Sequence, residues 1–508
     1  MAVVTFAAID VGSYELEITI YEISSKNGIR QIDRQRKVVG LGRDTYASGI
    51  ISSEKVDEVC RLLLRFKETM LEYQVEDYKA YATSALREAK NREVVLDQIK
   101  VRTGINVTVL SNSELRFICY KAIAAKETEF NNMILKGTAI AEVGSGSMQI
   151  SLFDKDALVT TNNIPLGALR VRQMTDRIGG TEAEKNKLIR DLIYNDIHAF
   201  KKMSLKGREV KNIIATGVCA LYMARTVQDD KQRMSREQFD AVYADVSSLT
   251  EEALAKKYDI PPEVLPIIVP GVIMYKELMD ATGAEMIWLP GVRLADGTVA
   301  EYAEQKKLLH FTHDFSRDIT EAARNTAGRY MCNREQYEAM ERNVLKIFDA
   351  TKKYHGLGKR ERLLLQISAI LNECGRYINL REPGECAYNI IMYTEIIGIS
   401  HKEREIIANV VKYKIGPFDY AADSPTLTKD MRIKIAKLTA ILKVAYDLGR
   451  GANGSFNEIK VSLKENTLFI STQSSNSIML EEARFKRTAD FFEEVYGIRP
   501  VIRKRKGV

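Results

Sequence analysis

Residues 6–21 read FAAIDVGSYELEITIY, and residues 138–153 read TAIAEVGSGSMQISLF. The two stretches align without a gap at a constant offset of 132 residues, and each alternates apolar and polar residues around a Gly-Ser turn. Because alternation with a period of two is typical of β-strands, each stretch predicts two strands joined by a tight turn. A repeat of this length exceeds the unit of a solenoid, which indicates two similar domains.

Strand and helix patterns alternate in the sequence that follows each turn. Behind the first turn, apolar residues at helical spacing over 56–73 lead to a short strand over 78–83 and a helix over 114–126. Behind the second turn, a helix over 182–203 leads to a strand over 213–215. This alternation predicts an α/β sheet in both copies.

The pattern changes in the second part of the chain. Residues 315–450 carry repeated helical periodicity and few strand signals, which predicts a helical bundle. The final segment, 456–506, reads as strand, strand, helix and strand. The expected fold is therefore two duplicated α/β domains, an all-α bundle and a small C-terminal α/β unit. The expected domain ranges are 1–125, 126–305, 306–452 and 453–508.

Composition excludes several classes of protein. The chain has 508 residues, of which 45% are hydrophobic and 28% charged, so it is not intrinsically disordered. The longest apolar runs, such as 267–275, are far shorter than the roughly 18–20 residues of a membrane span. The first residues lack the basic region of a signal peptide, and the six Cys are scattered. We therefore expect a cytoplasmic protein with reduced thiols and no membrane contact.

The formal charge of +7 is concentrated near the C-terminus. Five cations fall in the last ten residues, with no acid among them: Arg499, Arg503, Lys504, Arg505 and Lys506. Such a tail is either a solvated end or a contact for a polyanion, and the sequence leaves both interpretations open.

The duplicated turn is the strongest chemical signal in the sequence. Each copy places a carboxylate, Asp10 or Glu142, at the end of a strand, directly before the turn. Glycines let backbone N–H groups approach a phosphate, and serine hydroxyls add donors, whereas the carboxylate would hold a cation or orient water. The turn residues predicted to bind phosphate are Gly12, Ser13, Gly144, Ser145, Gly146 and Ser147.

Two phosphate loops in duplicated domains resemble the actin, hexokinase and sugar-kinase superfold, which is ribonuclease H-like. Four further segments narrow the resemblance. Residues 82–91, ATSALREAKN, resemble the A-T-x-A-x-R-x-A-x-N signature of the exopolyphosphatase and guanosine pentaphosphate phosphohydrolase (Ppx/GppA) family. Residues 165–170 (PLGALR), 215–217 (ATG) and 110–117 (LSNSELRF) are similar to other motifs of that family. The resemblance covers essentially the whole chain.

The resemblance implies roles for individual residues. Glu114 matches the family's general base, which activates the water that attacks the terminal phosphate, if one residue is missing just before it. The ungapped alignment instead puts Leu115 in the catalytic place. Arg87 is predicted to clamp phosphate, since a guanidinium forks onto two phosphate oxygens. Asn91 is expected to hold a local turn, and Arg170 either contacts substrate or covers the sheet edge.

Both loops depart from the family pattern. The first loop carries Tyr14, Glu15 and Glu17 where the family has Asn, Ser and Arg. The second carries Glu142 for Asp, Ser145 for Gly, and Gln149 for Glu. Acidic residues weaken the attraction for phosphate unless a cation lies between them. The resemblance implies Mg²⁺ as a cofactor, with Asp10 and Glu142 as its expected ligands.

The helical region falls where the family has an HD-type domain, but its metal ligands are replaced. At the expected His, His-Asp and Asp positions the chain has Gln336, Asn372-Glu373 and Tyr446. The literal pair His313-Asp314 comes too early and is predicted to lie in an interdomain linker. We therefore expect an HD-like bundle without a working metal site.

The expected function is that of an exopolyphosphatase-type hydrolase, which releases terminal orthophosphate from inorganic polyphosphate and also acts on guanosine pentaphosphate. The alternative is a weak or inactive regulatory protein that binds polyphosphate or a guanosine tetra- or pentaphosphate alarmone. A kinase of the same superfold is disfavoured by residues 82–91 and 114–117. A homodimer is expected from the resemblance, and a specific nucleic acid partner is not.

Overall fold

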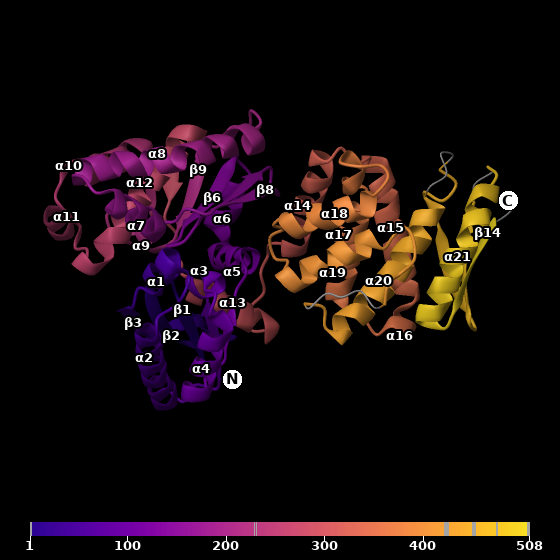
Figure 1. Cartoon of the computed structure of the whole chain (residues 1–508), viewed down its shortest axis with the longest axis horizontal. Helices are drawn as coiled ribbons and strands as arrows, with labels where there is room; N and C mark the ends of the chain where they lie inside the picture. Colours follow the sequence, from indigo (N-terminus) through magenta and orange to yellow (C-terminus); the bar gives the residue numbers. More distant parts are fainter. Residues whose placement is uncertain are drawn as a thin grey trace. The chain divides into compact units, whose positions relative to one another are not determined.

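The computed structural model describes residues 3–227, 229, 231–420, 426–449, 454–473 and 476–504. The chain divides into two compact units, Met1–Asp314 and Phe315–Val508. Figure 1 shows the first unit built from strands and helices and the second built mostly from helices. Of the basic tail, Arg505 and Lys506 lie outside the described residues.

The first unit contains two sheets with the same topology. The first sheet has the strand order β3-β2-β1-β4-β5, and the second has β10-β11-β9-β6-β7-β8. In both, the strand before the turn, β1 or β6, pairs antiparallel with the next strand, β2 or β7, and parallel with β4 or β9. The duplication predicted from the sequence is therefore confirmed in three dimensions. The strands are β1 Val4–Val11, β2 Glu15–Ser24, β3 Gly28–Val38, β4 Asp77–Ala82, β5 Val107–Val109, β6 Thr138–Val143, β7 Met148–Asp154, β8 Ala157–Ile164, β9 Asn212–Thr216, β10 Arg233–Ser235 and β11 Met286–Trp288.

Helices cover both sheets of the first unit (Figure 1). They are α1 Leu41–Ser48, α2 Ser53–Glu72, α3 Ser84–Glu88, α4 Arg92–Thr103, α5 Asn112–Ala124, α6 Glu127–Ile134, α7 Ala168–Ile178, α8 Glu182–Phe200, α9 Val218–Ala224, α10 Arg236–Ser248, α11 Glu251–Tyr258, α12 Leu265–Thr282 and α13 Leu294–Gln305. Helix α13 follows the second sheet in the chain but packs on the first, where Tyr302 stacks on Phe6 with ring centroids 4.2 Å apart.

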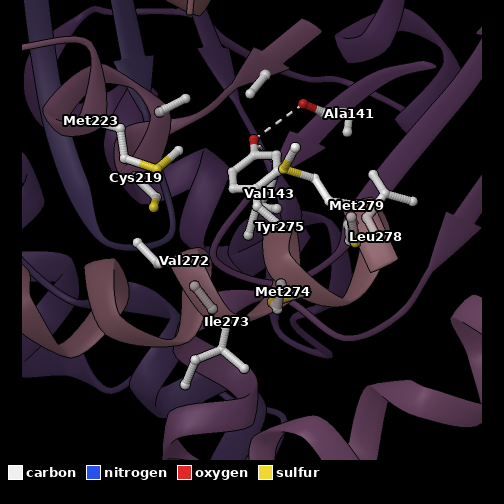
Figure 2. Close-up of a cluster of buried hydrophobic side chains, with 14 of the residues drawn as sticks. Ala141, Val143, Cys219, Met223, Val272, Ile273, Met274, Tyr275, Leu278 and Met279 are labelled. Carbon is white, nitrogen blue, oxygen red and sulfur yellow. Dashed lines mark hydrogen bonds between the residues drawn. The ribbon is translucent and has the colours of Figure 1, made fainter. Parts of the chain in front are cut away.

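Helix α12 forms the centre of the core behind the second sheet. Its Tyr275 is fully buried among Val143, Cys219 and Met279 (Figure 2). The Tyr275 hydroxyl lies 2.5 Å from the carbonyl oxygen of Thr216 and 3.1 Å from that of Ala141. These carbonyls belong to β9 and β6, so one phenol ties the helix to the two strands whose ends carry the candidate site.

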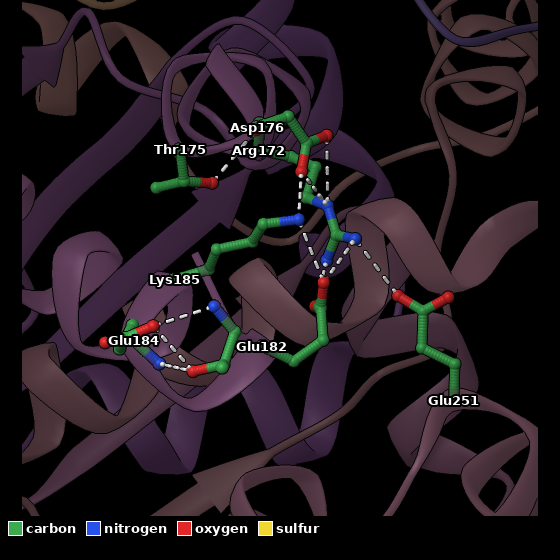
Figure 3. Close-up of polar contacts among 8 residues, drawn as sticks. Arg172, Thr175, Asp176, Glu182, Glu184, Lys185 and Glu251 are labelled. Atoms are coloured by element: carbon green, nitrogen blue, oxygen red, sulfur yellow. Dashed lines mark hydrogen bonds and ion pairs between the residues drawn. The ribbon is translucent and has the colours of Figure 1, made fainter. Parts of the chain in front are cut away.

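A charged cluster fixes the far end of α7. Figure 3 shows Arg172 between Asp176 and Glu182, with Lys185 on the same two carboxylates. Arg172 also reaches Glu251 of α11 at 3.3 Å. The acids are largely exposed, so each pair contributes little by itself, but together they tie α7 to α8 and α11.

The second unit is a helical bundle followed by a small sheet, as expected from the sequence. Its helices are α14 Phe315–Arg329, α15 Arg334–Ala350, α16 Lys352–His355, α17 Lys359–Ile370, α18 Pro383–Tyr393, α19 His401–Lys412, α20 Lys429–Leu448 and α21 Met479–Tyr496. Its sheet has the order β12-β13-β14, formed by Lys460–Lys464, Thr467–Thr472 and Arg499–Lys504. Among the described residues, no helix is both long and apolar enough to cross a bilayer. All six cysteines are free.

Replacing Tyr275 by Phe should lower the free energy of unfolding of the first unit by about 1–3 kcal/mol, because a buried carbonyl loses its donor and the Val143 N–H loses its acceptor. Trp288 is the single tryptophan of the chain and lies in this unit, so urea unfolding followed by tryptophan fluorescence measures the loss. The control is Tyr194→Phe, whose side chain is 50% exposed and should change stability by less than about 0.5 kcal/mol. Equal losses would contradict the role given to the Tyr275 hydroxyl.

Candidate active site

The two turns have the same backbone geometry. In the first, the Gly12 N–H donates to the Glu15 carbonyl at 3.0 Å, and in the second, the Gly144 N–H donates to the Ser147 carbonyl at 3.0 Å. A Cβ on Gly12 would come within 2.6 Å of the Glu15 oxygen, so glycine is required there. Helix α1 begins against the first turn and α7 against the second, through backbone donors to the Ser13 and Ser145 carbonyls.

Both turns face one cavity of about 140 Å³ between the two sheets of the first unit. The cavity brings together all but one of the site residues predicted from the sequence: Asp10, Gly12, Ser13, Arg87, Glu142, Gly144, Ser145, Gly146 and Ser147. It is also lined by Thr216, at the end of β9, and by Cys119 of α5. The offset of 132 residues therefore brings the two predicted loops together at one site.

Besides Nε of Arg293, three buried side-chain oxygens at this cavity have no hydrogen-bond partner among the described residues. They are Oδ1 of Asp10, Oε2 of Glu142 and Oγ1 of Thr216. Burial raises the pKa of the Asp10 carboxyl well above its usual value, and the neighbouring Glu17 and Glu15 raise it further. Unpaired buried oxygens are costly, so their convergence on one cavity indicates a place for a ligand.

The environment of Glu142 differs from that of Asp10. Burial raises the Glu142 pKa, but nearby Arg116 and, more weakly, Arg87 lower it. Asp10 has only acidic neighbours among the groups that shift its pKa. Of the two carboxyls, Glu142 is therefore the one better able to stay ionised near neutral pH.

Arginines compensate the acids of the first loop. Glu17 lies opposite Asp10 in the strand pairing and forms an ion pair with Arg34. Glu15 pairs with Arg36 at 2.9 Å. Both arginines lie on β3, so the positive charge that the acidic loop was expected to require comes from the protein itself. The sequence offered a signal, the alternating Arg34 and Arg36, but the sequence analysis did not single out 28–38 as a strand.

The second loop has the equivalent arrangement. Gln149 lies opposite Glu142, as Glu17 lies opposite Asp10, with the same register. Arg116 of α5 donates from Nε to Gln149 Oε1 at 3.1 Å and from Nη2 to the Asn162 carbonyl at 3.2 Å. Each half thus uses an arginine to hold the residue that faces its strand-end carboxylate.

The Ser13 hydroxyl has a structural role at the site. Its hydroxyl accepts a hydrogen bond from the Ala85 N–H at 2.8 Å and lies 2.8 Å from the Ser84 hydroxyl, which in turn contacts Tyr46. Gly146 of the second turn packs directly on Tyr46 and Ser84, where a Cβ would come within 2.2 Å of the tyrosine oxygen. The Ser13 hydroxyl therefore anchors the first turn to α3, beside the second turn.

Glu114 does not lie where a general base is needed. Its carboxylate accepts from the Ser111 backbone N–H at 2.9 Å and from the Ser111 hydroxyl at 2.6 Å, forming a capping box at the start of α5. Glu114 is not among the residues that line the cavity, whereas Leu115 is. Leu115, which the ungapped alignment places at the family's catalytic position, therefore lies at the cavity wall, while Glu114 caps the helix beside it.

The other motif residues hold the site together. Asn91 makes two hydrogen bonds with the backbone of Ile51, as expected of a residue that fixes a local turn. Arg170 donates to the Gly146 carbonyl at 2.9 Å and to Glu88 at 2.6 Å. It therefore connects the two halves beside the second loop. Arg87 donates to the Leu110 carbonyl at 2.8 Å and also lines the cavity.

The second unit has an ammonium group among the residues at the expected HD positions. Lys414 is 3% exposed, contacts Glu373 Oε1 at 2.9 Å and the Asn372 carbonyl, and lies 5.0 Å from the Tyr446 ring centroid. Burial lowers the Lys414 pKa, while Glu373 acts to raise it. No group of three or more His, Cys, Asp or Glu in the described part of the chain is placed to hold a metal ion. His313 lies just before the boundary of the two units, as the linker prediction required.

Two models of one protein family match the chain. The Ppx/GppA phosphatase family matches residues 19–305, and domain III of that family matches residues 319–487. The first match alone spans more than half of the chain. The chain belongs to the Ppx/GppA phosphatase family.

The curated relatives are distant. A bifunctional 3-dehydroquinate synthase/phosphatase of Fusobacterium nucleatum is 19% identical over 59% of this chain, which spans only 47% of that protein. A guanosine-5'-triphosphate,3'-diphosphate pyrophosphatase of Photobacterium profundum is 22% identical over 80% of both chains. Exopolyphosphatase 1 of Mycobacterium leprae is 20% identical over 57% of this chain and 87% of its own.

Solved structures share the fold. An exopolyphosphatase from Cytophaga hutchinsonii superposes with a TM-score of 0.52 at 17% identity, over 60% of this chain and 98% of its own. The Aquifex aeolicus Ppx/GppA family member gives a TM-score of 0.50 at 19% identity, over 60% of this chain and 99% of its own. At these identities the likeness establishes the actin-like fold and carries no residue roles.

Replacing Lys414 by Met should destabilise the second unit by about 3 kcal/mol or more, because Glu373 and the Asn372 carbonyl lose their buried cation. The matched control is Lys412→Met at the end of α19, where the lysine is 29% exposed and pairs with Glu385, so a change of about 0–1 kcal/mol is expected. Far-UV circular dichroism follows the helices of both units and Trp288 fluorescence follows the first alone, so a loss of ellipticity without a change in fluorescence belongs to the second unit. A similar loss in both variants would show that burial of Lys414 is not what matters.

Proposed function

We propose that this family member is a phosphoanhydride hydrolase that removes the terminal orthophosphate of inorganic polyphosphate, and the terminal phosphate of guanosine pentaphosphate, in the cavity of the first unit. The observation that carries the proposal is the convergence of two matched Gly-Ser turns on the unpaired oxygens of Asp10, Glu142 and Thr216. The relatives named for guanosine pentaphosphate and polyphosphate chemistry support the substrate class.

The cavity size fits a phosphate group rather than a nucleoside. A volume of about 140 Å³ is well below the roughly 300–1,000 Å³ of sites that enclose whole drug-sized ligands. The turns and the Arg87 guanidinium would therefore hold the terminal phosphates, while the rest of either substrate lies outside. This explains how one site serves substrates that share only their phosphate end.

The residues present fit a magnesium ion. Two buried carboxylate oxygens without partners, on Asp10 and Glu142, are hard anionic ligands, and Mg²⁺ in phosphate-transfer sites takes one or two protein carboxylates plus substrate oxygens. Asp10 is the residue that would hold it, and Glu142, the other expected ligand, is assigned to proton transfer below. The ion would neutralise charge on the transferring phosphoryl group.

Glu142 is the proposed acceptor of the proton from the attacking water. It lines the cavity with an unpaired oxygen, and Arg116 and Arg87 favour its ionised form. A carboxylate with a raised pKa accepts a proton more readily than an ordinary one. Asp10, surrounded by acids, is better suited to a cation. Glu114 acts as base in this scheme only if it leaves its helix cap.

The second candidate function is binding without turnover. The observation that favours it is Leu115, an apolar side chain at the cavity wall, beside a Glu114 that is held in a capping box. In that case polyphosphate or an alarmone would occupy the cavity without hydrolysis. Homodimerisation stays a prediction, which sedimentation of the full chain tests.

Phosphate release from long-chain polyphosphate with Mg²⁺ separates these functions. We expect Glu142→Gln to lower kcat by about 100-fold or more, since a general base contributes about 10²–10⁴. Glu114→Gln should lower it by less than tenfold, because glutamine keeps the capping box. The matched control is Glu184→Gln, which changes a capping-box glutamate of α8 that is fully exposed.

Three results would overturn parts of the proposal. Unchanged release by Glu142→Gln removes that residue from its role, and a 100-fold loss in Glu114→Gln restores Glu114 as the base. Binding of polyphosphate by the wild type without any release would establish the second candidate function.

The pH dependence of kcat/KM should reflect the raised pKa of Glu142. A base acts only when deprotonated, so activity falls as the pH drops through the pKa of the base. Because burial raises the pKa of Glu142, we expect this loss of activity at a pH above the ordinary glutamate pKa of 4.5. In Arg116→Gln the fall should move to still higher pH, since a cation that lowers the pKa is lost. A shift to lower pH, or none, would contradict the assignment.

A further inference from the structure

The C-terminal sheet has one covered face and one open face. In β13, Leu468 and Ile470 are fully buried, and their partners in register, Pro500 and Ile502, share that side. Helix α21 packs beside β14, and Figure 1 shows it running along the sheet. Because side chains alternate along a strand, the intervening residues share the opposite side. This open face carries Lys460, Ser462, Lys464, Phe469, Val501 and Arg503.

The open face is positively charged. Lys460, Lys464 and Arg503 are exposed, and the segments 460–464, 467–472 and 499–504 contain no acidic residue. Arg499, on the same strand, is ion-paired with Asp490 and Glu493 of α21 and adds little to the face. Three cations therefore stand around the centre of the sheet without acids on their own strands, which produces a local positive potential.

An aromatic ring lies at the centre of these charges. Phe469 is half-buried and pairs in register with Ser462 on one side and Val501 on the other. The Arg503 guanidinium carbon lies 3.6 Å from the Phe469 ring centroid, which is a cation–π contact. Arginine and aromatic side chains are both groups on which a base can stack.

We propose that this open face binds single-stranded nucleic acid without sequence preference, through its phosphates and stacked bases. Lys460 and Lys464 are four residues apart on one strand, which separates them by about 13 Å along the face. Single-strand-binding proteins combine such a basic track with aromatic or arginine stacking platforms. Inorganic polyphosphate has no planar group and would gain nothing from Phe469. The proposal does not rest on the hydrolase activity of the first unit.

The experiment is fluorescence anisotropy of the full-length protein with a labelled 12-nucleotide oligouridylate and the equivalent oligothymidylate. The triple variant Lys460→Gln, Lys464→Gln and Arg503→Gln should weaken binding at least about tenfold and flatten its salt dependence, which is about 0.7 per phosphate contact in log–log slope. Phe469→Leu keeps the buried apolar volume and the charge, and should weaken binding about fivefold through lost stacking.

The matched control is the triple variant Arg484→Gln, Lys486→Gln and Arg487→Gln, which removes the same charge from exposed positions of α21 in the same small domain. It should change affinity less than twofold. Equal loss in both triple variants, or no binding by the wild type in 0.1 M salt, would overturn the proposal. So would polyphosphate that competes fully while Phe469→Leu has no effect, since the face would then recognise charge alone.

Discussion

The site depends on two buried carboxylates, Asp10 and Glu142, each of which has one oxygen at the cavity without a hydrogen-bond partner. Removing such groups from water is unfavourable, and the fold compensates it only in part. Arg34 and Arg36 neutralise the neighbouring acids of the first loop, and Arg116 holds the amide opposite Glu142. The two oxygens at the cavity itself remain uncompensated, and a cation bound there would satisfy them.

The sequence predicted the features that depend on local patterns and missed those that depend on packing between distant segments. The duplication, the two turns and the helical second unit follow from local periodicity and a fixed offset, so they were predictable. The role of Glu114 was not, because a glutamate three residues after Ser111 satisfies both a catalytic motif and a helix cap, and only the packing of α5 decides between them. The compensating arginines of β3 were missed because their partners are distant in sequence until the strands pair.

In the second unit, buried acceptors are paired with a cation that belongs to the chain itself. At the expected HD positions, Glu373 and the Asn372 carbonyl converge on the Lys414 ammonium. A lysine carries its cation within the chain, so this part of the bundle requires no metal to satisfy its buried acceptors. Asp10 differs from these acceptors, since the groups that shift its pKa are all acidic.

Under the proposed function, the acidic surroundings of Asp10 affect whether the cavity favours a phosphate chain with or without a bound divalent cation. A phosphate chain that arrives without a cation meets two carboxyls, and repulsion from them opposes the attraction of Arg87. A chain accompanied by a divalent cation offers a ligand for the unpaired oxygens, and its binding draws the raised pKa of Asp10 down by favouring the ionised form. Binding of phosphate, binding of cation and loss of a proton from Asp10 are then linked. Under the proposed function, the dependence on a cation thus comes from Asp10 and Glu142 themselves, because Arg36 and Arg34 already pair with the deviant Glu15 and Glu17.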